Sequence, residues 1–203
     1  MFEIFVKGGI TMYPILLLSI ISLAIFLERL FVLRRENYIP KEFEEKLVNS
    51  LKKKDIKEAK LLCENNKSSI SNVSLSIISN TDLPLTRLLE VADEAGRREV
   101  VKLEKYQPLL QTIVAIAPLL GLLGTVFGMI KIFNVIAMQG AGQAQDLSAG
   151  IAEALITTAA GLIVAIPTQI FYHIVRNRAD SIASELEKSA SNIMNLIFKE
   201  DVE

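Results

Sequence analysis

Two stretches of the sequence decide the fold: residues 106–130 read YQPLLQTIVAIAPLLGLLGTVFGMI, and residues 154–175 read ALITTAAGLIVAIPTQIFYHIV. Neither contains Asp, Glu, Lys or Arg, and the same holds for a third stretch, residues 8–27. Lipid cannot hydrogen-bond an exposed backbone, so uncharged runs of about 20 residues are typical of membrane-spanning α-helices. The sequence therefore predicts an all-α integral membrane protein with three transmembrane helices.

The composition agrees with this class, since the 203-residue chain is 51% hydrophobic and its mean hydropathy is +0.38. A secretory signal peptide is the alternative for residues 8–27. Such peptides have an apolar core of about 7–15 residues, followed by a small-residue cleavage site. Here the run is longer and is followed by Glu28 and Arg29. We therefore expect an interfacial lead and a first span within residues 1–33.

Charged residues beside the spans predict the orientation. Nine basic residues flank one side, namely Arg29, Arg34, Arg35, Arg97, Arg98, Lys102, Lys105, Arg176 and Arg178. Only Lys7 and Lys131 flank the other. The positive-inside rule then places the N-terminus outside and the C-terminus in the cytoplasm. The regions following residues 1–33 are a cytoplasmic helical region (34–105), a membrane hairpin (106–178) with an outer loop at about 138–147, and a C-terminal cytoplasmic helix (179–203).

The cytoplasmic residues show helical patterns. Apolar spacing predicts helices over 41–54 and 69–79, and Asp55 is a suitable N-cap for a helix between them. From Leu85 the helical pattern runs unbroken to Met138, and residues 176–198 continue the third span. We expect these extensions to form a cytoplasmic bundle. Cys63, the single cysteine, is expected to be a small buried side chain.

Small residues recur at helical spacing in both spans of the hairpin. They are Ala117, Gly121, Gly124 and Gly128 in one, and Gly150, Ala154, Thr158, Gly161 and Ala165 in the other. Such stripes let helix backbones approach closely. They can pack the hairpin on itself or on another copy. We predict that they assemble a homo-oligomer.

Polar side chains inside the spans are the candidate functional residues. Thr125 and Thr158 lie 16 and 17 residues from Ala141 at the hairpin tip, which predicts similar depths, and Thr157 lies beside them. Each threonine can instead bond its own helix carbonyl. Glu153 is either an interfacial carboxylate or a group that faces a cavity or a partner, because a charge at the bilayer centre costs about 2.5–3.5 kcal/mol. We predict that these four residues line a proton pathway.

The remaining notable residues do not predict a catalytic or metal-binding site. Pro118 and Pro167 fall inside the second and third spans, where we expect kinks. His173, the only histidine, is expected at the membrane interface, and we predict no metal site and no other cofactor. The sequence has no phosphate-binding loop and no visible nucleophile–base pair. We therefore expect no catalytic residues, no enzyme activity and no nucleic-acid partner.

Two segments carry a resemblance to a known family. They are Ile116-Ala-Pro-Leu-Leu-Gly-Leu-Leu-Gly-Thr-Val-Phe-Gly-Met129 and Gly150-Ile-Ala-Glu-Ala-Leu-Ile-Thr-Thr-Ala-Ala-Gly-Leu-Ile-Val-Ala-Ile-Pro167. The chain resembles the MotA/TolQ/ExbB proton channel family, most specifically over residues 97–178. Flagellar MotA has a fourth span, so three spans favour the ExbB/TolQ branch, and we favour an ExbB-like protein.

The resemblance implies a motor protein of the bacterial inner membrane that uses protons as its coupling ion. It implies a ring of five subunits around an ExbD- or TolR-type single-span partner, usually a dimer, whose aspartate carries the proton. The pore positions implied are Thr125, Glu153 and Thr158. An ExbB-like role would energise TonB-dependent outer-membrane transport, and a TolQ-like role would serve TolA and the Tol-Pal envelope system. A passive membrane scaffold is the third possibility.

Overall fold

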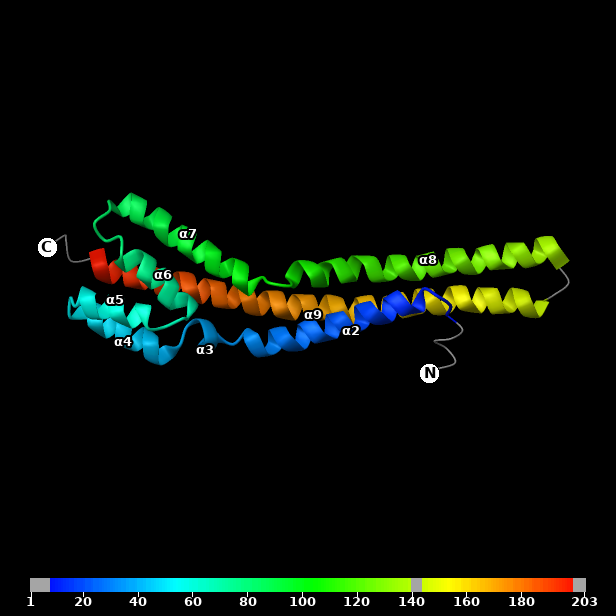
Figure 1. The fold of residues 1–203 in the computed structure, drawn as a ribbon, viewed down its shortest axis with the longest axis horizontal. Coiled ribbons are helices and arrows are strands. Elements are labelled where there is room, and N and C mark those ends of the chain that lie inside the picture. The colour runs from blue at the N-terminus through cyan, green and yellow to red at the C-terminus, as the bar shows by residue number, and fades with distance from the viewer. Residues whose placement is uncertain (1–7, 140–143, 199–203) are drawn as a thin grey trace. The chain divides into compact units, whose positions relative to one another are not determined.

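The computed structural model describes residues 8–139 and 144–198, and every regular element in these ranges is a helix (Figure 1). Three of the helices are long and apolar enough to cross a membrane: α2 (Met12–Val32), α8 (Gln107–Gln139) and α9 (Ala144–Phe198). The predicted all-α class with three candidate spans is confirmed. The predicted interfacial lead, residues 1–7, lies outside the described ranges, and the orientation stays a prediction.

Contacts divide the described chain into two units. The membrane unit comprises residues 8–28, 106–139 and 144–174, and so contains most of α2, all of α8 and the first part of α9. The bundle unit comprises residues 29–105 and 175–198, and so contains the remainder of α9. Because each unit has its own internal contacts, each is described separately below.

Prolines sit in all three long helices of the membrane unit. Pro14 lies in the first turn of α2, where the missing backbone N–H costs little. Helices α8 and α9 continue through Pro118 and Pro167, and the predicted kinks stay predictions. The rings of Phe26 and Phe171 stack with their centroids 4.0 Å apart, which packs α2 against α9.

The predicted unbroken helix from Leu85 to Met138 is wrong. Helix α7 (Leu85–Leu103) ends before α8 begins at Gln107, and between them Tyr106 has a φ of 69°. The physical reason is Pro108, which has no N–H to bond the carbonyl of Glu104 and is tolerated only in the first turn of a helix. The matching prediction for the third span holds, because α9 runs without interruption to Phe198.

The tip of the hairpin lies between α8 and α9, where the sequence predicts an outer loop at about 138–147. Helix α8 extends to Gln139 and α9 already begins at Ala144. The two tip glycines, Gly140 and Gly142, lie in the residues between these helix ends, outside the described ranges.

The bundle unit packs five shorter helices with the last part of α9. The helices besides α7 are α3 (Arg35–Tyr38), α4 (Lys41–Lys52), α5 (Ile56–Glu64) and α6 (Ser69–Ile78). Its core includes Ile39, Phe43, Leu47, Leu51, Ala59, Cys63, Ile70, Val73, Ile77, Leu88, Leu186 and Ile193. The predicted N-cap is confirmed, because Asp55 accepts a hydrogen bond from the backbone N–H of Glu58 at 2.9 Å. Cys63 is buried as predicted, and burial raises its pKa to about 12.

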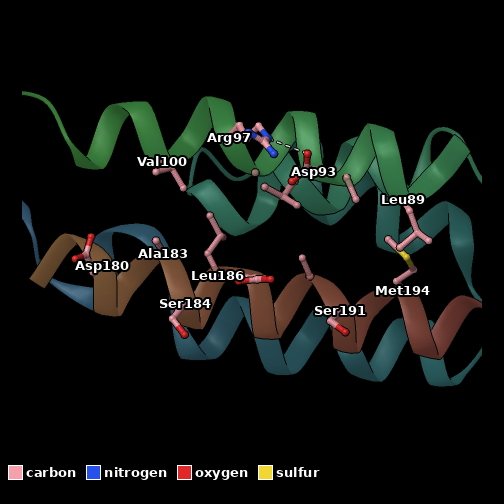
Figure 2. A pocket seen from close by; sticks show the side chains of 15 residues that line it. Leu89, Asp93, Arg97, Val100, Asp180, Ala183, Ser184, Leu186, Ser191 and Met194 are labelled. Carbon is pink, nitrogen blue, oxygen red and sulfur yellow. Dashed lines mark hydrogen bonds and ion pairs between the residues drawn. The ribbon is translucent and has the colours of Figure 1, made fainter. Parts of the chain in front are cut away.

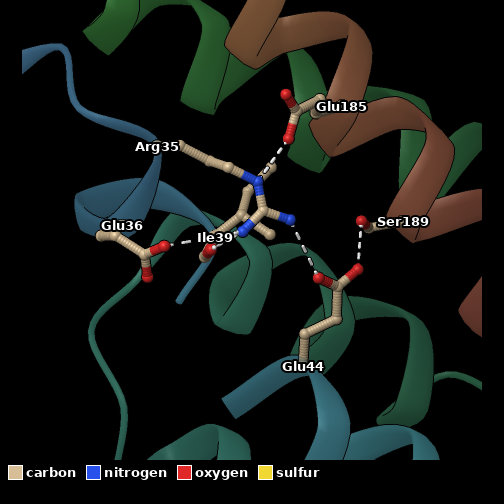
Figure 3. A network of polar contacts seen from close by, with 6 residues as sticks. All are labelled: Arg35, Glu36, Ile39, Glu44, Glu185 and Ser189. Carbon is tan, nitrogen blue, oxygen red and sulfur yellow. Dashed lines mark hydrogen bonds and ion pairs between the residues drawn. The ribbon is translucent and has the colours of Figure 1, made fainter. Parts of the chain in front are cut away.

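Two polar networks fasten the bundle helices to one another. In the first, Arg35 binds Glu185 at 2.5 Å and Glu44 at 3.3 Å, and Ser189 donates to Glu44 at 2.6 Å (Figure 3). The hydrogen bond with Glu185 raises the pKa of Arg35, against the opposing effect of burial. This network links α3, α4 and α9.

The second network surrounds Glu99, a buried carboxylate on α7. It accepts hydrogen bonds from Ser69 at 2.6 Å and Asn72 at 3.0 Å, both on α6, and from Lys102. Burial alone would raise the pKa of Glu99, but the hydrogen bonds from Lys102, Ser69 and Asn72 outweigh it and lower the pKa. The carboxylate thus fastens α6 to α7.

Candidate functional site

The small-residue stripes of α8 and α9 face each other within one chain. A Cβ atom on Gly121 would lie 2.9 Å from the carbonyl oxygen of Thr157, and one on Gly128 would lie 2.9 Å from that of Gly150. A Cβ atom on Gly161 would lie 2.6 Å from the carbonyl oxygen of Ala117. Backbone cannot yield to such contacts as a flexible side chain can. Glycine at these positions therefore allows the close approach of the two helices.

The stripes therefore pack the hairpin on itself within one chain. We expected Gly121, Gly124, Gly128 and Gly161 to offer surface for assembly with other copies. In this chain they lie inside the hairpin, and Ala154, which is 6% exposed, packs against Gly128. Packing of the hairpin on itself is thus observed, and assembly of copies through these residues stays a prediction.

The outward faces of the two helices carry large apolar side chains instead. On α8 they include Leu119, Leu122, Val126, Met129, Ile130 and Phe133. On α9 they include Leu155, Leu162, Ile163, Ile166 and Ile170. A helix surface of this kind suits lipid or another apolar helix.

Thr157 is buried inside the membrane unit, with no exposed surface. Its hydroxyl bonds the carbonyl oxygens of Ala154 at 2.9 Å and Glu153 at 3.0 Å, both on its own helix. It packs against Gly124. A Cβ atom added to Gly124 would also lie 2.8 Å from the hydroxyl oxygen of Thr11, just before α2. In this chain Thr157 therefore packs between α8, α9 and the residue before α2, and its place in a proton pathway stays a prediction.

Thr125 and Thr158 are each partly exposed, but they are not at one depth. The hydroxyl of Thr158 donates across the hairpin to the carbonyl of Gly121 at 3.2 Å, four residues before Thr125. Four residues of helix span about 6 Å, so the equal-depth prediction is wrong by about one turn. The hydroxyl of Thr125 donates to the carbonyl of Leu122 on its own helix at 2.6 Å.

Glu153 lies near the end of the hairpin next to residues 140–143 and is paired. The Nζ atom of Lys131 on α8 lies 2.7 Å from each of its carboxylate oxygens. The side chain of Glu153 is only 15% exposed, whereas that of Lys131 is 61% exposed. The sequence reasoning missed this pair, because it treated Lys131 only as a flanking charge. The signal was available, since both residues lie at similar distances along the chain from the tip glycines.

The bundle unit contains one further candidate, a groove of about 620 Å³ between α7 and α9 (Figure 2). Its lining includes residues with little or no side chain, namely Gly96, Ala183 and Ala190. On α7, Asp93 and Arg97 form an ion pair of 2.8 Å. Within the described ranges, no group of three His, Cys, Asp or Glu side chains could hold a metal ion. His173 contacts Gln169 at 2.8 Å on its own helix. The groove has the character of a packing surface.

Comparison with known proteins identifies the family. The model of the MotA/TolQ/ExbB proton channel family matches residues 44–188. An ExbB-like 1 biopolymer transport protein of Synechocystis sp. is 35% identical over 84% of this chain and 68% of its own length. The ExbB-like 3 protein of the same organism is 31% identical over 84% of this chain and 82% of its own length. The Tol-Pal system protein TolQ of Haemophilus influenzae is 42% identical over 45% of this chain and 40% of its own length. The chain therefore belongs to the MotA/TolQ/ExbB proton channel family.

Proposed function

We propose that this chain is the ExbB-like subunit of a proton-driven motor in the bacterial inner membrane. In this proposal five copies form a ring around the membrane helices of an ExbD-type partner, and proton flow through the ring energises a TonB-type protein. The observation that carries the proposal is the hairpin of α8 and α9, whose partly exposed Thr125 and Thr158 lie within the residues matched by the family model. The coupling ion is the proton, with no cofactor.

The chemistry of these hydroxyls suits a supporting role. A hydroxyl does not titrate near neutral pH, so the proton would ride on a carboxylate of the partner. Thr158 already donates its hydrogen to the carbonyl of Gly121, which fixes the direction of its lone pairs. Those lone pairs can accept a hydrogen bond from water or from a protonated carboxyl. Thr158 would thus accept a hydrogen bond from the protonated carboxyl of the partner. Thr125 would accept the same kind of bond about one helical turn away.

A TolQ-like role is the second candidate. It is favoured by the match to TolQ of Haemophilus influenzae, which has the higher identity over a shorter stretch. The ExbB-like role is favoured by two relatives that each match 84% of this chain. The membrane chemistry is the same in both, and the difference lies in the protein that receives the work.

The experiment is affinity purification of the full chain from membranes of its own cells in mild detergent. Mass spectrometry of the intact complex should give five copies of this chain with two copies of a single-span protein. The co-purifying proteins should include a TonB-type rather than a TolA-type protein. A complex containing TolA would support the TolQ-like role instead. Recovery of the chain alone as a monomer would overturn the proposal and leave the passive scaffold.

A further inference from the structure

We propose that Lys131 is a positioning residue that holds Glu153 as a fixed anion and thereby fastens three segments of the membrane unit together. This inference rests on the proposed function, because it assigns Glu153 a part in the proton-driven work. In that work Glu153 would not carry the proton. Its ion pair would instead hold α9 against α8, with the residues before α2 packed against the carboxylate, in the arrangement that the hydroxyls need.

The first observation is the geometry of the ion pair. Both carboxylate oxygens of Glu153 lie 2.7 Å from the Nζ atom of Lys131, so one ammonium group serves the whole carboxylate. The carboxylate is largely shielded, while the lysine remains mostly exposed. The pair joins α8 to α9 across the hairpin.

The second observation is the close approach of the chain before α2. Gly9 has a φ of 70°, in the left-handed region that favours glycine. A Cβ atom there would collide with the Oε1 atom of Glu153, and one on Gly8 would lie 3.2 Å from Ile156. Any side chain at position 9 would therefore displace the carboxylate from its place beside Lys131.

The consequence concerns how protons can move. Both oxygens of Glu153 face one ammonium group, and Gly9 covers one of them. A carboxylate held in this way is a poor relay, because a relay must turn between a donor and an acceptor. Its position is still useful, because Thr158 follows on the same helix and bonds Gly121 across the same hairpin. Fixing α9 against α8 at Glu153 fixes this contact as well.

Exchanging the charges of Lys131 and Glu153 by mutation tests whether Glu153 is a fixed anion or a proton carrier. Proton flux is measured in liposomes that contain the full complex of this chain with its co-purifying single-span partner. Lys131→Gln and Glu153→Gln should each lower the flux at least tenfold. Lys131→Arg, and the double variant Lys131→Glu with Glu153→Lys, should each keep at least a third of it. Lys57→Gln, on the exposed face of α5, is the control and should change nothing.

Two results would overturn the proposal. One is an assembled double variant that is as inactive as Glu153→Gln, because a proton carrier cannot be exchanged for lysine. The other is wild-type flux in Lys131→Gln.

A second measurement does not depend on the function. The thermal midpoint of the full chain in detergent is compared for Lys131→Met, Glu153→Gln and the double variant. If the residues act as a pair, the double variant should lose no more than the worse single variant. Gly9→Ala should lower the midpoint as well. Additive losses would overturn the pairing. The two proposals can fail separately. If the thermal losses of the variants are coupled but the wild-type complex shows no proton flux, the ion pair stands and the proposed function is overturned.

Discussion

In the membrane unit the tightest contacts between helices are made at glycines, whereas in the bundle unit the interior is filled by large side chains. Gly121, Gly128 and Gly161 bring α8 and α9 together backbone to backbone. In the bundle unit, Leu47 and Ile70 are fully buried. Water drives apolar side chains into a core, but lipid supplies no such force between helices. The comparison teaches that one chain uses two different means of packing, each suited to its solvent.

The largest effect is expected when a side chain is added to the glycine contacts. Gly161→Leu should remove the folded protein from membranes, because its Cβ would lie 2.6 Å from the carbonyl oxygen of Ala117 and 3.2 Å from the Cα of Gly121. Overpacking of this kind typically costs about 1–3 kcal/mol, and the cost is highest where backbone must move. The amount of monodisperse protein after size-exclusion chromatography in detergent measures the loss.

The matched control is Gly96→Leu on α7. A Cβ atom on Gly96 has no neighbour within 4 Å, so this variant should give normal amounts of protein. If Gly161→Leu is recovered as well as Gly96→Leu, the backbone contact between α8 and α9 is not what holds the hairpin together.

The next effect tests the core of the bundle unit. Leu88→Ala should lower the free energy of unfolding by about 2–5 kcal/mol, because Leu88 is fully buried and the truncation leaves a cavity. Its neighbour Leu89 is 51% exposed, so Leu89→Ala should cost clearly less. Thermal midpoints of the full chain in detergent measure both. Equal losses for the two variants would show that the bundle has no such core.

A smaller effect is expected at Glu99. Glu99→Gln should cost about 1–3 kcal/mol at neutral pH, because the buried hydrogen bonds from Ser69, Asn72 and Lys102 lose a charged acceptor. The pKa of Glu99 is lowered in the folded protein. The folded state thus binds its proton less readily than the unfolded state does. The stabilisation is therefore present above the unfolded pKa of about 4.3, and it is lost as the pH falls through the folded pKa.

The measurement is the thermal midpoint of wild type and Glu99→Gln between neutral and acid pH. The difference between the two proteins should shrink as the pH falls below about 4.3. A difference that stays constant over this range would show that the charge of Glu99 contributes nothing.

Much of this architecture could be predicted from the sequence, because apolar runs and helical periodicity report local physics. The three spans, the helices of the bundle and the cap at Asp55 follow from such patterns. The break at Tyr106 was missed because an apolar pattern continues across it, although Pro108 marked the place. Periodicity shows which residues share a face but not which surface that face meets. For this reason the sequence alone left open whether the glycine stripes pack within the hairpin or against another copy.

The site was predicted less completely than the fold. Thr125, Thr158 and Glu153 stood out because polar groups are costly in lipid. The lysine that pairs with Glu153 comes 22 residues earlier, on the other helix of the hairpin, and Gly9 comes from a third segment. Such contacts depend on the register between helices. The register in turn depends on the glycine contacts, so it becomes clear only once the helices are packed.

The most direct test of the proposed function is proton flux through the complex with the single-span partner, comparing two threonines of α9. Thr158→Val removes the hydroxyl that donates across the hairpin to Gly121, while Thr168→Val removes one that donates to Val164 on its own helix. Both variants keep the shape of the side chain. The account predicts an intact assembly in both, with flux reduced to background in Thr158→Val and kept near the wild-type rate in Thr168→Val. Wild-type flux in an assembled Thr158→Val complex would contradict it.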